Sequence, residues 1–184
     1  IFAALTWLGK NLKDYPADMD NIFLAGDSAG GHFVCVTTAI NLNEEMQEDF
    51  GVEHVGYDFK AVAAICPAID LLTPNFLMNV NVPVLLGEKW RKSKFKKYMM
   101  VKNLVSDKFP PFHILTAQGD ELLKRQAPIL ADIFRKNNVD FRFCNFTGQL
   151  NGKYLGHVFN VVDPFSIYGE QANTDITDFF KSKM

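Results

Sequence analysis

The sequence predicts an α/β fold in which a mainly parallel sheet is covered by helices on both faces. Three stretches, 21–25, 61–69 and 112–117, are continuously apolar, as strands buried on both faces of a parallel sheet are. Segments with helical spacing of apolar residues alternate with them, and this alternation is typical of such sheets. The expected elements are strands over 21–25, 61–69, 112–117 and 140–147 and helices over 2–12, 33–42, 127–138 and 165–183.

The bulk composition is that of one globular domain over residues 1–184. The chain is 48% hydrophobic and 22% charged, and its net charge of −2 gives no general attraction to nucleic acid or membrane. No stretch approaches the roughly 18 consecutive apolar residues of a membrane span. Cys35, Cys66 and Cys144 lie among apolar neighbours and are interpreted as free buried thiols. We therefore expect no disulfide, no metal and no organic cofactor.

The first strand ends in Gly26-Asp27-Ser28-Ala29-Gly30, which matches the Gly-x-Ser-x-Gly pattern of a nucleophile elbow. In an elbow, the serine sits in a strained turn between strand and helix, and small residues two before and two after it let these elements pack closely. The following helix directs amide N–H groups at the site, so the N–H of Ala29 is a candidate oxyanion donor. The alternative is a glycine-rich turn with an incidental serine, but the flanking strand and helix favour the elbow.

A serine nucleophile needs a base, and the chain holds four histidines. His32 follows the serine by one helical turn and is expected to pack or cap near the elbow. His54 lies in a polar loop, and His113 lies inside the third strand, where a structural histidine is expected. His157 follows the fourth strand in a glycine-containing loop, which is where a base belongs, because parallel strands place functional loops at their carboxyl ends.

The carboxylate that orients the base is predicted in "LTAQGDELL" (115–123), where Asp120 directly follows the end of the third strand. Its alternative role is to cap a helix that begins at the next residues, and Glu121 is the second candidate for the orienting acid. Ser28, Asp120 and His157 then follow successive strands in the order Ser, Asp, His. Three placements at one edge of the sheet support a triad more strongly than the elbow alone.

These residues make the chain resemble the C-terminal part of an α/β-hydrolase, and "GDSAGG" (26–31) is similar to the motif of hormone-sensitive-lipase-like esterases. The other stretches that carry the resemblance are "PAID" (67–70), "FPPFHILTAQGDELL" (109–123) and "GHVF" (156–159). The resemblance implies that Ser28, Asp120 and His157 are the catalytic triad and that Ala29 supplies one oxyanion donor.

Two parts of that family's pattern are not in this sequence: a His-Gly-Gly-Gly type segment, which supplies further oxyanion donors, and the first four strands. We therefore expect the chain to be a fragment and a weak or inactive catalyst, since losing an oxyanion donor costs roughly 3 kcal/mol or more. The elbow strand is central in the family. Its open edge here is expected to be covered by self-association or by residues outside this sequence.

Residues 71–108, between the second and third strands, are interpreted as a cap or lid over the acyl site. They include the basic segment, "KWRKSKFKKY" (89–98), with six cations. The alternative is that 71–108 packs on the sheet and the lysines form a solvated face; anionic membrane contact is a minor alternative, because no sustained apolar face accompanies them. The acidic segment (44–49) is interpreted as a solvated loop.

The function predicted from these observations is a serine hydrolase that cleaves small or medium carboxylic esters without a cofactor. An amide hydrolase, arylformamidase-like or peptidase-like, shares the triad and stays open. A non-catalytic binding protein on the same fold is the alternative from another class. We expect a small-molecule ester as substrate, no nucleic acid partner, no stable membrane insertion and a cytoplasmic location.

Overall fold

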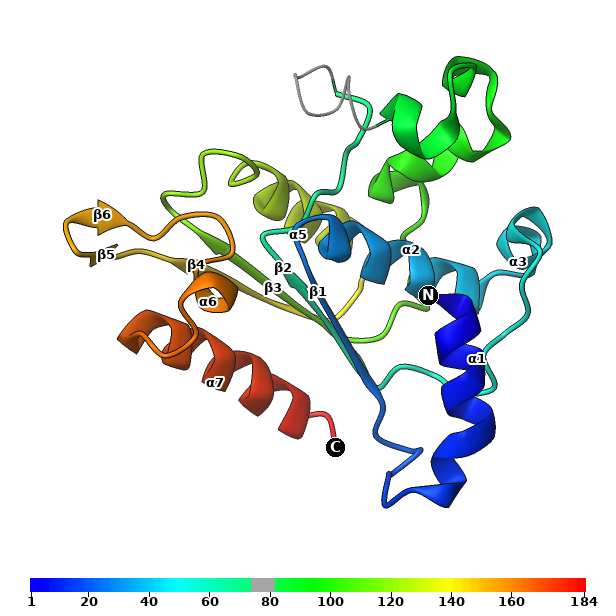
Figure 1. The fold of residues 1–184 in the computed structure, drawn as a ribbon, viewed down its shortest axis with the longest axis horizontal. Coiled ribbons are helices and arrows are strands. Elements are labelled where there is room, and N and C mark those ends of the chain that lie inside the picture. The colour runs from blue at the N-terminus through cyan, green and yellow to red at the C-terminus, as the bar shows by residue number, and fades with distance from the viewer. Residues whose placement is uncertain (74–81) are drawn as a thin grey trace.

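The centre of the molecule is a four-stranded parallel sheet in the order β1-β2-β3-β4 (Figure 1). The structure is a computed structural model and describes residues 1–73 and 82–184. The strands are β1 (Phe23–Asp27), β2 (Ala61–Ile65), β3 (Phe112–Ala117) and β4 (Phe141–Phe146). The predicted α/β class with a mainly parallel sheet is confirmed. The first residue of each strand lies within two residues of the predicted start.

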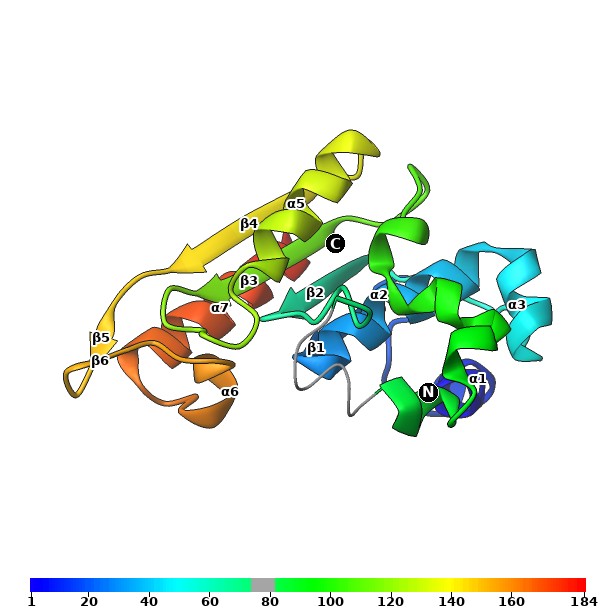
Figure 2. The same ribbon diagram turned by 90° about the horizontal axis from the view of Figure 1, so that it is seen from above.

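Helices cover both faces of this sheet, as Figures 1 and 2 show. On one face lie α2 (Ala29–Leu42) and α5 (Gln126–Lys136), and on the other lies α7 (Ile167–Lys181). The structure also contains α1 (Phe2–Asn11), η1 (Leu12–Asp14), α3 (Glu44–Phe50), η2 (Trp90–Lys92), η3 (Lys94–Met99), η4 (Val101–Asn103), β5 (Gln149–Leu150), β6 (Lys153–Tyr154) and α6 (Phe159–Val162).

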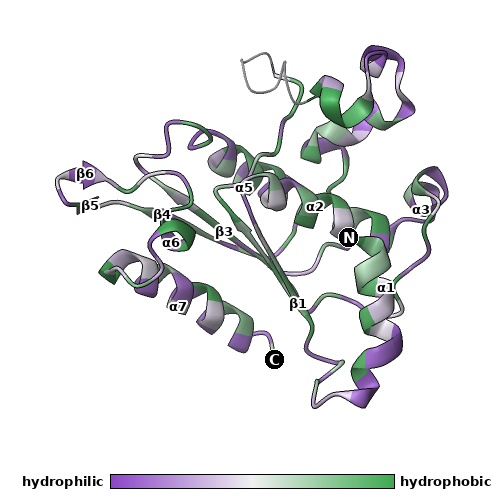
Figure 3. Ribbon diagram, viewed as in Figure 1, coloured by the Kyte–Doolittle hydropathy of each residue, from purple (hydrophilic) through white to green (hydrophobic). Residues whose placement is uncertain are grey.

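The central strands are continuously apolar because their side chains supply two cores. In β2, Val62 and Ala64 join the core under α2 and α5, whereas Ala63 and Ile65 join the core under α7. All of β2 and β3 is buried. Alternation of side chains across a strand, with both faces covered, produces this pattern. Accordingly, α2 is largely hydrophobic in Figure 3, while α7 carries both kinds of residue.

The first strand is less buried than its sequence predicts. Residues 21–25 were expected to form a buried strand, but β1 is only half-buried and Ala25 is exposed. The reason is topological: among the described residues β1 pairs with β2 alone, so it is an edge strand. The open edge agrees with the expectation from the family resemblance. Its coverage by self-association stays a prediction.

The acidic segment (44–49) is not a loop; it forms most of α3, which corrects the sequence interpretation. Asn43 caps the helix by accepting a hydrogen bond from the Met46 N–H at 2.9 Å, and Met46 is buried. Gly51 ends it in the left-handed conformation, at φ 63°. Acidic residues in a first turn stabilise the helix dipole, so the charges favour this helix rather than oppose it.

Part of the basic segment (89–98) packs against this helix through Lys94, Lys97 and two aromatic side chains, Phe95 and Tyr98. Lys94 lies 3.0 Å from Asp49, and Lys97 lies 3.0 Å from Glu45 and 3.1 Å from Asp49. The hydrogen bonds that Asp49 accepts from Tyr98 and from the two lysines hold its pKa well below the ordinary value. Half-exposed pairs of this kind contribute little one by one. Their arrangement nevertheless joins two charged segments that lie far apart in the sequence.

The predicted strand 61–69 ends early, at Ile65, because the chain turns sharply there. Cys66 has a positive φ of 43°, and the proline that follows has no N–H to continue a ladder. The hairpin of β5 and β6, before the His157 loop, was not predicted from the sequence.

Part of the predicted cap over 71–108 falls on residues 74–81, which lie outside the described residues. The cap assignment therefore stays a prediction. No helix in the described residues is long and apolar enough to cross a membrane.

Candidate active site

Ser28 occupies the turn between β1 and α2 with a backbone that non-glycine residues rarely adopt, at φ 54° and ψ −113°. Hydrogen bonds from both sides hold this conformation. The Ser28 N–H donates to the Ile65 carbonyl at 2.9 Å, and the Ser28 carbonyl accepts from the N–H groups of Gly31 at 3.1 Å and Ala68 at 3.0 Å. The loop after β2 thus supports the elbow, and the strain is the one expected of a nucleophile elbow.

The glycines around Ser28 are not equivalent. A Cβ at Gly26 would lie 2.3 Å from the Gly30 carbonyl oxygen, so only glycine fits there. A Cβ at Gly30 would meet nothing within 4 Å, which corrects the expectation that this position must be small. The second steric requirement falls instead on Gly31, whose Cβ would lie 2.6 Å from Pro67. The close approach thus involves the β2 loop as well as the elbow.

The backbone after Ser28 is arranged to receive an oxyanion. Ala29 begins α2, where amide N–H groups have no carbonyl four residues earlier in the helix. Its N–H and the positive end of the helix dipole lie directly beside the serine. Asp27 is the last residue of β1 and is half-buried; it belongs to the elbow through its backbone.

The three predicted triad residues are brought together. His157 Nε2 lies 2.8 Å from Ser28 Oγ, and His157 Nδ1 lies 2.9 Å from Asp120 Oδ2. A carboxylate only accepts hydrogen bonds, so Nδ1 carries the proton and Nε2 is free to accept from the serine hydroxyl. The Asp120 side chain is fully buried, whereas that of His157 is 23% exposed. The candidate base is therefore held by a buried carboxylate on one side and is partly exposed on the other.

Asp120 contacts His157 as predicted, but it caps a turn rather than a helix, because α5 begins only at Gln126. Its Oδ1 accepts from the N–H groups of Leu122 at 3.1 Å and Leu123 at 2.9 Å, while Oδ2 orients His157. These two hydrogen bonds from backbone N–H groups hold the Asp120 carboxylate in place independently of its contact with His157. Glu121, the second candidate, is exposed and pairs with Lys124, whereas the contact with His157 is made by Asp120.

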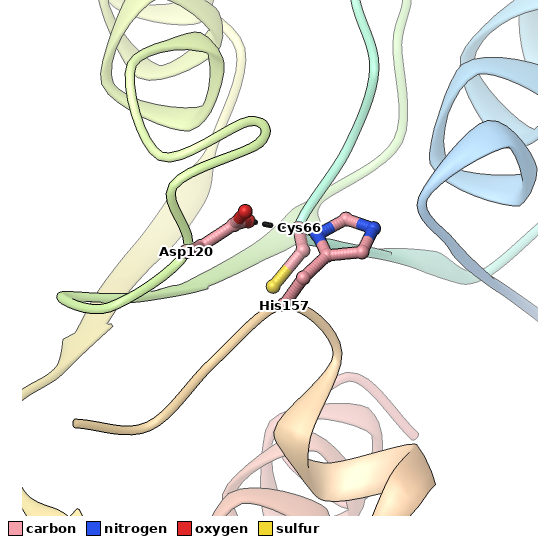
Figure 4. A group of neighbouring side chains, drawn as sticks. All are labelled: Cys66, Asp120 and His157. Atoms are coloured by element: carbon pink, nitrogen blue, oxygen red, sulfur yellow. Dashed lines mark hydrogen bonds and ion pairs between the residues drawn. The ribbon is translucent and has the colours of Figure 1, made fainter. Parts of the chain in front are cut away.

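Cys66 also lies at this site, although it is not among the site residues predicted from the sequence. Its Sγ lies with Asp120 and His157 in one group whose polar atoms are all within 4.8 Å of one another (Figure 4). The Sγ accepts a hydrogen bond from the Val158 N–H at 3.4 Å, next to the base. Burial raises the pKa of this thiol to about 12, so Cys66 stays protonated and does not compete with Ser28 as a nucleophile. Its position at the carboxyl end of β2 was the available sequence signal.

The other three histidines lie outside the hydrogen-bonded chain of Ser28, His157 and Asp120. His32 is buried in α2, and its ring nitrogens have no hydrogen-bond partner among the described residues. His113 is fully buried in β3 and contacts Asp175, and His54 is partly exposed beside Asp58. A cleft of about 690 Å³ lies beside Ile69 and α5, but no triad residue lines it. That cleft is not the place where Ser28 would meet a substrate.

Comparison with known proteins relates this geometry to esterases. A family model described as BD-FAE matches residues 1–132. No curated protein matches the sequence significantly.

Among solved structures, esterase B from Lactobacillus rhamnosis is similar over 99% of this chain and 59% of its own, with a TM-score of 0.86 and 25% identity. The same esterase inhibited by a C4-C4 tributyrin phosphonate gives a TM-score of 0.87 and 26% identity, over 99% of this chain and 58% of its own. An acetyl ester-xyloside bifunctional hydrolase from Caldicellulosiruptor lactoaceticus has 19% identity and supports the fold alone, with a TM-score of 0.72 over 98% of this chain and 63% of its own. The chain spans less than two thirds of each of these proteins.

Proposed function

The chain belongs to the BD-FAE family and has the α/β-hydrolase fold, and from this premise we propose that it is a serine hydrolase that cleaves carboxylic esters through an acyl-enzyme intermediate. The observation that carries the proposal is the continuous chain of hydrogen bonds from Ser28 Oγ through His157 to Asp120. Each link has the distance and the direction that nucleophilic catalysis by serine requires.

In the proposed reaction, Ser28 Oγ attacks the ester carbonyl carbon while His157 Nε2 takes the hydroxyl proton. The carbonyl oxygen becomes an oxyanion, which the Ala29 N–H and the α2 dipole stabilise. The intermediate collapses, the bond to the alcohol oxygen breaks, and His157 returns its proton to that oxygen. Water then attacks the acyl-serine, with His157 again as base, and releases the acid. Asp120 holds the imidazole tautomer throughout and stabilises its protonated form.

We propose that turnover by the 184-residue chain is slow. Ala29 is the one oxyanion donor that we assign, and the His-Gly-Gly-Gly type segment of the family is not in this sequence. Removing one oxyanion donor costs about 2.7–4 kcal/mol in the activation free energy, which corresponds to about 10²–10³-fold in rate. Acylation by a reactive ester would still proceed, because it needs the nucleophile and the base above all.

For the acyl group we propose a short chain. The support is the structural similarity to esterase B, which was solved with a C4-C4 tributyrin phosphonate inhibitor. The cap prediction for residues 71–108 enters here as well, since such a segment would set the length of the acyl pocket.

The test is hydrolysis of p-nitrophenyl acetate, butyrate and octanoate by the protein and by its Ser28→Ala variant. We expect a measurable rate on the two shorter esters and none above background in the variant. Equal rates for both proteins would overturn the serine mechanism. A matched p-nitroanilide series decides between ester and amide cleavage, because faster anilide turnover would favour the amidase alternative. A folded protein inactive on both series would favour the binding-protein alternative.

A further inference from the structure

A second cluster of histidine, cysteine and carboxylate lies away from the triad, between the sheet and α7. Parallel pairing places His113 of β3 beside Arg142 of β4, and two residues further on it places Leu115 beside Cys144. His113, Arg142 and Cys144 therefore project from the face that α7 covers. Asp175, in the middle of α7, meets all three of these side chains.

The contacts converge on the two oxygens of one carboxylate. His113 Nε2 lies 2.7 Å and Cys144 Sγ lies 3.1 Å from Asp175 Oδ2, while Arg142 lies 3.0 Å from Oδ1. The nitrogen, sulfur and oxygen atoms of His113, Cys144 and Asp175 all lie within 4.8 Å of one another. The proposed catalytic reaction uses none of these groups.

We propose that His113 Nε2, Cys144 Sγ and Asp175 Oδ2 form a binding site for a zinc ion. Imidazole nitrogen, thiolate sulfur and carboxylate oxygen are the three ligand types that Zn²⁺ takes in proteins. Ligand distances of 2.0–2.3 Å with tetrahedral angles put such atoms about 3.4–3.6 Å apart, so the two short contacts would open by about 0.5–0.7 Å. The Asp175 side chain is 29% exposed and has room to make this movement.

The hydrogen-bond partners of the histidine and the carboxylate leave room for a metal. Nδ1 of His113 has no partner among the described residues, so a ring proton placed there displaces no existing hydrogen bond and Nε2 is left to ligate. Arg142 binds Oδ1 and leaves Oδ2 for the metal, the way an outer partner orients a ligating carboxylate.

The cluster is reachable from solvent. A surface cleft of about 750 Å³ runs between β4 and α7, and both Cys144 and Asp175 line it. Asp178 lines the same cleft one helical turn beyond Asp175. A water molecule that enters through this cleft can therefore complete a fourth coordination position. The opposing interpretation is that the cluster only hydrogen-bonds α7 to the sheet.

The test measures zinc binding by the purified protein after treatment with a chelator and its removal. Zinc chloride is titrated against a chromophoric competitor, and Co²⁺ is used as the spectroscopic probe. We expect one Zn²⁺ per chain with a Kd of about 10 μM or tighter, a higher Tm with zinc, and a thiolate-to-Co²⁺ charge-transfer band. Cys144→Ser should remove the band and Asp175→Asn should weaken binding at least tenfold.

Cys66→Ala is the matched control, because Cys66 is the other thiol that lies near a histidine and a carboxylate. It should leave the band and the Kd unchanged. Loss of the band in Cys66→Ala with its retention in Cys144→Ser would overturn the assignment. So would a folded wild-type protein that binds no stoichiometric zinc, which would leave the hydrogen-bonding interpretation. Asp175→Asn, at the partly exposed rim, keeps the test decisive if Cys144→Ser fails to fold.

Discussion

Two histidine–carboxylate pairs in this molecule differ in which partner is buried. In the triad, the carboxylate of Asp120 is fully buried and His157 is 23% exposed; beneath α7, His113 is fully buried and Asp175 is 29% exposed. The second ring nitrogen of His157 meets Ser28, whereas that of His113 has no partner among the described residues. A histidine that moves protons needs an oriented ring and an accessible nitrogen. A histidine–aspartate contact alone therefore does not identify a catalytic base.

The largest expected effect separates the two histidines. His157→Gln removes the proposed base and should lower kcat/KM for a p-nitrophenyl ester by about 10⁴-fold or more. His113→Gln should leave kcat/KM within about fivefold while lowering the free energy of unfolding by about 1–3 kcal/mol, because a buried hydrogen bond is lost. Ester kinetics and urea unfolding of both variants check this. A large loss of kcat/KM in a folded His113→Gln variant would contradict the assignment of different roles to the two histidines.

The next largest effect is expected from replacing the carboxylates of the two pairs, Asp120 and Asp175. Asp120→Asn should lower kcat by about 10³–10⁴-fold, because an amide no longer holds the correct tautomer of His157. Asp175→Asn should leave the rate unchanged and lower stability by about 1–2 kcal/mol, measured by urea unfolding with chelator present. Equal rate losses in the two variants would show that the distinction between the pairs is wrong.

The elbow glycines give a further test of the difference between the two histidine–carboxylate pairs, because only the pair in the triad depends on the elbow. Gly26→Ala should lower stability by about 3 kcal/mol or more and remove activity, since its Cβ would lie 2.3 Å from a backbone oxygen. Gly30→Ala meets open space in a helix and should change stability by less than about 1 kcal/mol. Thermal unfolding and ester hydrolysis measure both. If Gly30→Ala were as damaging as Gly26→Ala, the steric account of the elbow would fail.

The last prediction concerns His32, a third histidine, whose ring nitrogens have no hydrogen-bond partner among the described residues. Burial lowers the pKa of His32 from 6.5 to about 4, only partly offset by the nearby backbone of Ala68. The unfolded chain thus takes up the proton first as the pH falls. The contribution of neutral His32 to the free energy of unfolding is therefore present above pH 6.5. It is lost as the pH falls from 6.5 to 4, by up to about 3 kcal/mol.

The replacement His32→Gln, which has no titratable ring, should flatten that part of the stability profile. Urea unfolding at pH 7 and pH 5 tests this, with the wild-type protein measured in the same buffers. Identical slopes for the two proteins would contradict the assignment of the acid sensitivity to His32.

Most of the sheet could be predicted from the sequence, because burial on both faces makes its strands continuously apolar. The residues 112–117 are the bounds of β3 itself. The burial of β1 was not predictable in this way, because an edge strand can carry the same apolar residues as a central one. The loop interpretation of the acidic segment (44–49) is wrong for a different reason. Its charge alone favours a solvated loop, whereas the Asn43 cap, the acidic first turn and Gly51 together indicate a helix.

The candidate site was predictable as far as each residue follows a strand. Ser28, Asp120 and His157 obey that rule, and the parallel topology brings them together. The contact of Cys66 with the His157 loop depends on the positive φ of Cys66 itself, and no sequence pattern predicts that φ. Asp175 lies in mid-helix and meets β3 and β4 only through the packing of α7. Such contacts arise from tertiary structure and not from local spacing.

The central claim is that Ser28 is a nucleophile activated by His157. The most direct test is labelling with a fluorophosphonate probe, read by intact mass, on the wild-type protein and on Ser28→Ala and His157→Gln. The account predicts one adduct per wild-type chain, none on Ser28→Ala, and labelling slowed by about 10²-fold or more on His157→Gln. A folded wild-type protein that stays unlabelled, or an adduct that persists in Ser28→Ala, would contradict it.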